Sequence, residues 1–268
     1  MEKEMNVWPA VESKVRPAVV HIECRYRVRR PMIQNETGTA AVMVDEFGGH
    51  VTGSGVQIKP GLILTALHVV EPWKLVIADW DDVVEKSAVQ PEYEVLEVRF
   101  PGQPPLQASV IAASKENGLA LLRVEATKTR LVPLARANSG VRVTDSIAIL
   151  GYPGSPEEYQ IPAKNASGSA GAIREVNPMF LVGTVTQPLS GTSRSLSFDA
   201  AVEPGMGGGP VVNRRGEVIG IVTLRFDKPG PPLEILGRTA ATRLPSPAGH
   251  QAVSPNGIRT FLRQHGVP

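Results

Sequence analysis

The stretch PGMGGGPVVNRRGEVIGIVT, residues 204–223, decides the fold class of this chain. Two runs rich in β-branched residues, 210–212 and 217–223, flank the turn formed by residues 213–216. A turn that begins with Asn and ends with Gly, placed between two such runs, favours an antiparallel β-hairpin. The sequence therefore predicts two adjacent antiparallel strands, preceded by a glycine-rich loop.

Short runs of the same kind recur along the chain, between Gly, Pro, Asn and Asp residues. They cover residues 19–28, 39–44, 61–65, 119–124, 146–150, 180–186 and 197–202. Because the interior shows no long helical periodicity, this pattern predicts antiparallel β-structure, as a sandwich or as barrels. The length of 268 residues suggests two such units, 1–130 and 131–268, connected through the polar stretch 126–144.

A helix is expected at the C-terminal end of the chain. Ser254 is a suitable N-cap, Pro255 fits the first helical position, and Gly266 is a suitable stop. We expect this helix to pack on a barrel, because one of its faces carries an apolar and aromatic row. The row consists of Ile258, Phe261, Leu262 and His265.

A shorter helix is expected near the N-terminus. Val11 and Val15 lie four residues apart after Pro9. This spacing places both side chains on one face and favours one or two helical turns.

The composition is that of an ordinary globular protein, and it narrows the possible functions. Lys and Arg total 28 and Asp and Glu total 26, a formal net charge of +2, which argues against nucleic-acid binding. The one cysteine, Cys24, excludes an internal disulfide and a thiolate zinc cluster, and the five histidines show no ligand spacing. We therefore expect no metal and no cofactor.

The first residues carry charge, and no apolar stretch long enough for a secretory signal or a membrane span follows them. We therefore expect a cytoplasmic protein that does not associate with a membrane. One basic cluster is present, and its first three members alternate with apolar residues at the period of a strand, so we interpret it as a solvated face. The cluster consists of Arg25, Arg27, Arg29 and Arg30.

Three segments carry a recognisable combination of motifs. Residues 53–70 contain GSGV, at 53–56, and GLILTALHVV, at 61–70, which includes His68. Residues 110–122 read VIAASKENGLALL, and residues 199–213 read DAAVEPGMGGGPVVN. Together these segments resemble the trypsin-like serine proteases and, within them, the bacterial HtrA/Deg branch.

The resemblance implies two six-stranded antiparallel β-barrels with a C-terminal helix, and no PDZ module. It places His68 at the catalytic histidine, Gly118 at the position of the catalytic aspartate, and Gly207 at that of the nucleophilic serine. In such a triad the serine oxygen attacks the carbonyl, the histidine takes its proton, and the aspartate orients the imidazole. Glycine supplies neither the oxygen nor the carboxylate, so the resemblance implies a protein that does not cleave peptides. Strand alternation makes Glu116 and Asn117 poor substitutes for the aspartate.

Recognition of a polypeptide can survive this loss. The resemblance implies that the amides of Gly205 and Gly207 form an oxyanion hole, because backbone donors do not depend on the missing hydroxyl. Since residues 207–209 are all glycine, we expect the hole to become ordered only when it is occupied. The resemblance also places the small Ala201 near the floor of the specificity pocket, where it suits an apolar side chain. It places three residues on the edge against which an extended peptide pairs, namely Thr223, Leu224 and Arg225.

Three functions stay open at this point. The first is a catalytically silent trypsin-like protein that binds an extended peptide or a protein partner in the former active-site cleft. The second is a cytoplasmic HtrA-like serine endopeptidase whose triad positions were replaced artificially, although alanine is the more usual replacement and Met206 also departs from the family pattern. The third is a structural or assembly module in which the cleft is unused.

Overall fold

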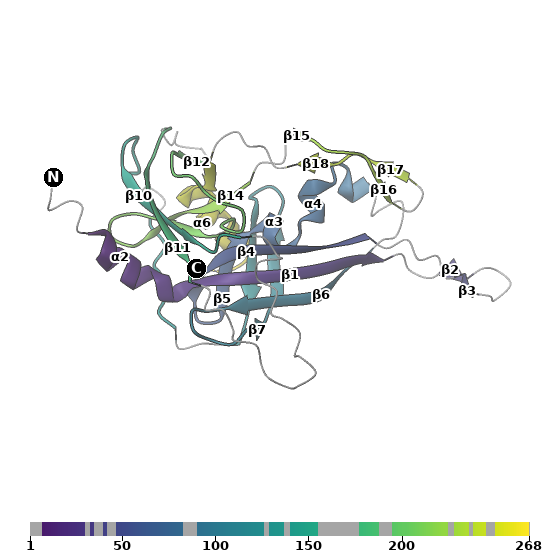
Figure 1. Ribbon diagram of the computed structural model, residues 1–268, viewed down its shortest axis with the longest axis horizontal. Helices are drawn as coiled ribbons and strands as arrows, with labels where there is room; N and C mark the ends of the chain where they lie inside the picture. Colours follow the sequence, from purple (N-terminus) through teal and green to yellow (C-terminus); the bar gives the residue numbers. More distant parts are fainter. Residues whose placement is uncertain are drawn as a thin grey trace.

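The chain folds into two curled antiparallel sheets with short helices, as a computed structural model shows (Figure 1). The structure describes residues 7–29, 33–34, 40–41, 47–82, 90–125, 129–136, 140–154, 177–187, 195–224, 228–235, 238–244 and 250–267. The helical elements are α2 (Trp8–Val15), the 3-10 turn η1 (Arg16–Ala18), α3 (Leu67–Val70), α4 (Trp73–Val76) and α6 (Pro255–Gln264).

Two larger sets of strands form the main sheets. Those of the first sheet are β1 (Val19–Arg29), β4 (Phe47–Lys59), β5 (Leu62–Ala66), β6 (Gln90–Arg99), β7 (Leu106–Gln107), β8 (Ser109–Ser114) and β9 (Leu119–Arg123). Those of the second sheet are β10 (Ser146–Gly151), β11 (Met179–Thr184), β12 (Ser195–Phe198), β13 (Pro210–Val212), β14 (Val218–Thr223) and β19 (His250–Val253). Three two-stranded sheets pair β2 (Ile33–Gln34) with β3 (Ala40–Ala41), β15 (Lys228–Pro229) with β18 (Arg243–Leu244), and β16 (Leu233–Ile235) with β17 (Arg238–Ala240).

The first sheet has the order β7-β6-β1-β4-β5-β9-β8. Its two edge strands, β7 and β8, are consecutive pieces of chain separated only by Ala108, whose amide donates to the carbonyl of Leu96 at 2.8 Å. One bent segment therefore pairs with β6 at one edge and with β9 at the other, which curls the sheet. This division explains why seven strands are present where the sequence predicted six.

The second sheet has the order β11-β10-β13-β14-β19-β12, and these six described strands match the number that the family resemblance implied, although the sequence pattern had not indicated β19. Its edges also approach each other: Val185 bridges to Phe198, and the amide of Thr186 donates to the carbonyl of Ser197 at 2.9 Å. The prediction of an all-β fold with two curled antiparallel sheets is therefore confirmed. The segment expected to connect the two halves runs from the end of β9 to the start of β10, and the boundary at residue 130 stays a prediction.

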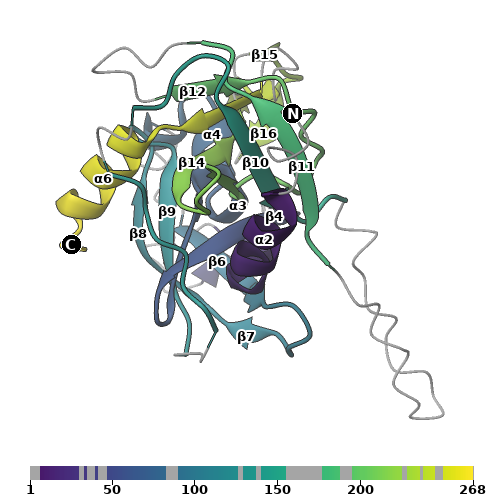
Figure 2. The ribbon, with the colours of Figure 1, turned by 90° about the vertical axis from the view of Figure 1, so that its left-hand side faces the viewer.

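Both terminal helices form where the sequence predicted them. In α6 the side chain of Ser254 accepts a hydrogen bond from the amide of Gly257, and Phe261 is fully buried. His265 follows the last helical residue and its ring packs against that of Phe261, with centroids 4.8 Å apart. Figure 2 shows α6 beside β8 and β9, with α2 in front of the sheets. None of the helices in the described part of the chain is long and apolar enough to cross a membrane.

The sequence analysis missed β4 as a continuous strand, because its four glycines read as turn residues. The structure shows why two of them are needed. A methyl carbon on Gly53 would lie 2.5 Å from a side-chain carbon of Val69, and one on Gly55 would lie 2.8 Å from the side chain of Ile63. Glycine here allows the strand to pack closely against its neighbours.

Two other expected strands differ in extent. The run predicted at 197–202 is β12, which ends at Phe198, because the side chain of Asp199 accepts hydrogen bonds from the amide and the hydroxyl of Thr184. In the run predicted at 39–44, only Ala40 and Ala41 lie within the described residues, as β3.

Candidate functional site

The structure brings His68, Gly118 and Gly207 together between the two sheets. His68 lies in α3, directly after β5, while Gly207 lies in the loop before β13. The ring of His68 provides the three atoms nearest to the position of a methyl carbon on Gly207, with Nε2 in contact and Cε1 at 2.9 Å. The carbonyl of Gly118 accepts a hydrogen bond from the amide of Leu67 at 2.9 Å. His68 therefore lies against Gly207, and Gly118 is hydrogen-bonded to the residue that precedes His68.

Ser54 of β4 fastens the loop of residues 205–209 to the first sheet. Its hydroxyl donates to the carbonyl of Gly205 at 2.8 Å and accepts from the amide of Tyr152 at 2.8 Å. Its amide donates to the carbonyl of Gly207 at 2.7 Å. This role of Ser54 was not predicted from the sequence, where its position between two glycines of the GSGV motif was the available signal.

Replacing Ser54 with Ala is expected to lower the free energy of unfolding by about 2–3 kcal/mol, because a carbonyl and an amide lose their partner. Urea unfolding followed by tryptophan fluorescence measures this loss. Ser109→Ala, at an exposed position of β8, is the matched control and should change stability by less than about 0.5 kcal/mol. Equal effects of the two substitutions would contradict the proposed role of Ser54.

The glycines of the loop are not equivalent. A methyl carbon on Gly205 would lie 2.5 Å from the carbonyl oxygen of Tyr152, and Gly205 has a φ of +85°. At Gly208, with a φ of +86°, and at Gly209, a methyl carbon would overlap backbone oxygens. Gly207 has no positive φ, and the three atoms nearest to an added methyl carbon all belong to the side chain of His68. The backbone therefore requires glycine at the other positions but accepts a side chain at 207.

The loop is anchored by its own hydrogen bonds as well. The amide of Gly208 donates to the carbonyl of Val222 at 2.8 Å, and the amide of Gly209 donates to the carbonyl of Met206 at 3.0 Å. In contrast, the amides of Gly205 and Gly207 donate no hydrogen bond to any residue that the structure describes. Unpaired amides at a buried loop are rare in folded proteins. The two donors expected to form the oxyanion hole therefore make no hydrogen bond within the described residues, and whether they become ordered only on binding stays a prediction.

Gly118 and Gly207 differ in what limits a side chain: at Gly118 there is space for one, but the backbone conformation is unfavourable. A methyl carbon would lie 3.8 Å from the hydroxyl of Thr223 and 4.0 Å from a side-chain carbon of Val253, so there is room. The φ of +66° is nevertheless the left-handed conformation, in which Asp is strained, though less than most residues. The buried Asn117 does not take the place of the aspartate, because its amide donates to Ser114 and to Gln264 of α6.

His68 is buried, with 5% of the residue exposed. Burial lowers the pKa of His68 from 6.5 to about 4. A buried imidazole is harder to protonate because the charged form loses its hydration. His68 is therefore neutral at pH 7, and its ring lies against Gly207, which has no side chain.

The residues expected to contact a peptide lie in different environments. Ala201 is exposed, three residues after the end of β12. Thr223 is half-buried at the end of β14, and Leu224, which follows it, is 38% exposed. Arg225 lies outside the described residues.

Two curled antiparallel sheets, with a histidine from the first beside a glycine-rich loop from the second, define the scaffold of a trypsin-like peptidase. The model of the trypsin-like peptidase domain matches residues 53–221, and the chain belongs to this family. The chain is 28% identical over 180 residues to a probable periplasmic serine endoprotease DegP-like of Hahella chejuensis, and 26% identical over 226 residues to serine protease HTRA3 of Homo sapiens. These alignments cover 67% and 83% of this chain, which confirms the resemblance to the HtrA branch.

A further relative is the uncharacterized protein y4bJ of Sinorhizobium fredii, 35% identical over 132 residues and 49% of this chain. The chain spans less than half of each of these three relatives: 18% of the Sinorhizobium protein, 31% of the Hahella protein and 41% of the human protein.

Proposed function

We propose that this chain binds an extended polypeptide segment at the site around His68 and Gly207 and does not cleave it. The observation that carries the proposal is that the amides of Gly205 and Gly207 donate no hydrogen bond within the described residues, while the imidazole of His68 lies against Gly207, which has no side chain. Two backbone donors suit a peptide carbonyl oxygen. Cleavage needs a nucleophile, and glycine at position 207 has none.

The absence of cleavage is tested with a fluorophosphonate probe, which reacts with activated serines, and with unfolded casein as a substrate. We expect neither labelling nor cleavage under conditions in which trypsin, run in parallel, gives both. Labelling of this protein, or casein cleavage that is lost in His68→Ala, would contradict the proposal and would point to another serine as the nucleophile.

Binding is tested by NMR on protein labelled with ¹⁵N-glycine, with unfolded casein as the probe. The amide signals of Gly205 and Gly207 are expected to shift. The signals of Gly102 and Gly140, where the surroundings are open, serve as internal controls and should not move. Shifts confined to glycines far from His68 would instead favour the structural or assembly role.

Leu224→Asp is expected to weaken casein binding about 10-fold, because it places a charge where an apolar peptide side chain would pack. Leu131→Asp is the matched control, since the two leucines are 38% and 39% exposed and Leu131 lies before the second sheet. Isothermal titration measures both variants. If both weaken binding equally, or neither does, the end of β14 is not the peptide-binding edge.

A further inference from the structure

The positive charge of the chain is concentrated in two segments. Residues 126–143 and 254–268 contain six Lys and Arg residues and neither Asp nor Glu. Because the formal net charge of the whole chain is +2, the other residues carry +2 minus +6, a net charge of −4. A chain that is nearly neutral as a whole can therefore present one strongly basic region, and such a region attracts anions.

The two basic segments lie against each other in the fold. The guanidinium of Arg259, in α6, donates to the carbonyl of Leu134 at 3.2 Å and to that of Ala135 at 2.6 Å. Arg136 directly follows Ala135, and Arg263 lies one helical turn after Arg259, with its Nε donating to the carbonyl of Arg259 at 3.4 Å. Three arginines from distant parts of the chain therefore lie close together, where α6 meets the connection between the two sheets.

Residues 130–136, the linker segment, are attached to both sheets by main-chain hydrogen bonds. The amide of Val132 donates to a carbonyl of the first sheet at 3.3 Å, and the amide of Ala135 donates to a carbonyl of the second sheet at 2.9 Å. Both residues are 1% exposed, whereas Arg130 and Arg136 are exposed. The buried residues therefore hold the segment in place, and its two arginines are accessible from solvent.

The charges of these arginines are not balanced within the described part of the chain. Arg130, Arg136 and Arg263 are exposed, and none of them forms an ion pair with a described residue. Arg259 is bound by neutral carbonyl oxygens, which leave its positive charge in place. A negatively charged partner would therefore meet four guanidinium groups without displacing a carboxylate.

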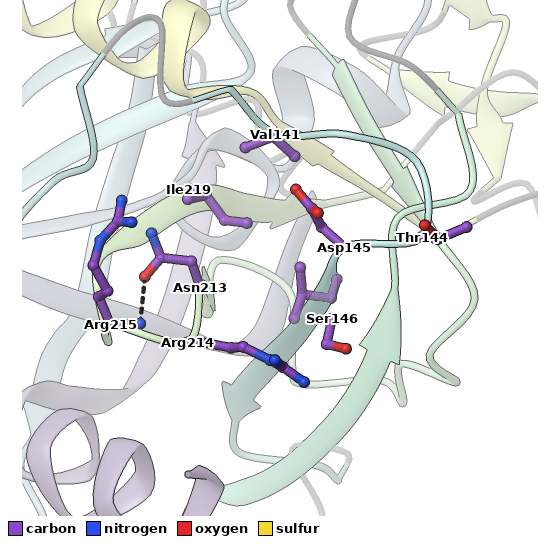
Figure 3. Close-up of a pocket in the computed structure, with 9 residues that line it drawn as sticks. Val141, Thr144, Asp145, Ser146, Asn213, Arg214, Arg215 and Ile219 are labelled. Carbon is purple, nitrogen blue, oxygen red and sulfur yellow. Dashed lines mark hydrogen bonds between the residues drawn. The ribbon is translucent and has the colours of Figure 1, made fainter. Parts of the chain in front are cut away.

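The turn of residues 213–216 also carries two arginines, but there the charges are balanced. Arg215 pairs with the carboxylate of Glu217 at 2.7 Å, and Asp145 lies across a pocket of about 400 Å³ from this turn (Figure 3). Groups of both signs thus lie side by side at that place. The surface formed by the linker segment and α6 is the one that favours a negative partner.

We propose that Arg130, Arg136, Arg259 and Arg263 form a basic surface that binds a short acidic polypeptide segment. The planar guanidinium group can bind a carboxylate through two hydrogen bonds, which suits the side chains of Asp and Glu. A short segment is favoured over a nucleic acid or a membrane, because a large polyanion would extend over the rest of the molecule, where the net charge is −4. The proposal does not depend on the site around His68 and Gly207.

Fluorescence anisotropy with a labelled decapeptide of L-glutamate tests this binding. The wild-type protein is expected to bind the probe saturably. The affinity should fall at least about 5-fold when the salt concentration rises from about 50 to about 300 mM, because salt screens exposed charges. A decapeptide of L-lysine should not bind. Absence of saturable polyglutamate binding, or an affinity that salt does not change, would overturn the proposal.

A triple variant locates the binding. It combines Arg130→Gln, Arg136→Gln and Arg263→Gln, and we expect it to weaken polyglutamate binding about 10-fold, because each exposed ion pair contributes a modest factor. Arg259 is kept, because its guanidinium connects α6 to the linker segment.

The matched control removes the same net charge from three exposed arginines elsewhere and should change the affinity less than about 2-fold. It combines Arg25→Gln, Arg215→Gln and Arg243→Gln. Equal weakening by the two triple variants would show that binding follows net charge alone and would overturn the assignment to this surface. If phosphatidylserine vesicles or a thymidylate decamer bound the wild-type protein more tightly than polyglutamate does, the choice of a polypeptide would be overturned.

Discussion

Gly207→Ala is expected to lower the free energy of unfolding by about 2 kcal/mol, and most of this loss should disappear when His68 is also replaced by Ala. The added methyl carbon would overlap Nε2 of His68, so the buried ring must leave its place. Overpacking of a buried site typically costs about 1–3 kcal/mol. Because the backbone at 207 has no positive φ, the ring is the main obstacle.

A double-mutant cycle measures this coupling by urea unfolding of the wild-type protein, the two single variants and the double variant. We expect a coupling free energy of about 1–2 kcal/mol between the two positions. Gly102→Ala is the matched control, because its φ is +66° and no atom lies within 4 Å of the added carbon. Its cost should be the same with and without His68. A Gly207→Ala cost that does not depend on His68 would show that the ring does not fill the vacant place.

The cycle also separates two explanations for the glycine at 207. If the fold required glycine there, as it does at Gly205 and Gly208, substitution would be costly in every background. The geometry instead indicates that the backbone at 207 is compatible with a side chain and that the neutral ring of His68 occupies the volume that this side chain would need.

Local rules predicted those parts of the fold that depend on neighbouring residues in the sequence. The turn at residues 213–216 and the Ser254 cap of α6 are examples, because cap and turn chemistry acts within four residues. The strand β4 was missed because its glycines serve contacts with Val69 and Ile63, which the local pattern does not contain.

The candidate site was also predicted only in part, because some of its contacts are local in the sequence and others are tertiary. Motif spacing selected His68, Gly118 and Gly207, and the fold brings them together. The packing of the imidazole against Gly207 depends on the distance between two elements from different sheets. The hydrogen bond from Ser54 to Gly205 also joins residues about 150 positions apart in the chain. Such contacts are set by tertiary packing, and no periodicity or propensity encodes them.

The stability of the folded protein is expected to depend on pH through two buried histidines. The folded protein is expected to lose stability as the pH falls from 6.5 to about 4. Burial lowers the pKa of both His21 and His68 to about 4, and Arg99 also contributes at His21. In this range the unfolded chain binds protons that the folded chain does not, so stability rises with pH. Each histidine contributes about 3 kcal/mol, which is fully present above pH 6.5 and lost near pH 4.

Urea unfolding at several pH values measures this dependence, and variants assign it. His68→Gln and His21→Gln should each remove about half of the loss between pH 6.5 and 4. The carboxylates of Asp199 and Glu217 have a pKa lowered mainly by hydrogen bonds, from Thr184 and from Arg215 respectively, so their contributions are lost as the pH falls through their ordinary values of 3.8 and 4.5, at the acid end of this window and below it. Direct titration of the imidazole signals by NMR gives the decisive comparison. A pKa near 6.5 for His68 would mean that the ring is solvated, and a solvated ring cannot be the one that fills the space beside Gly207.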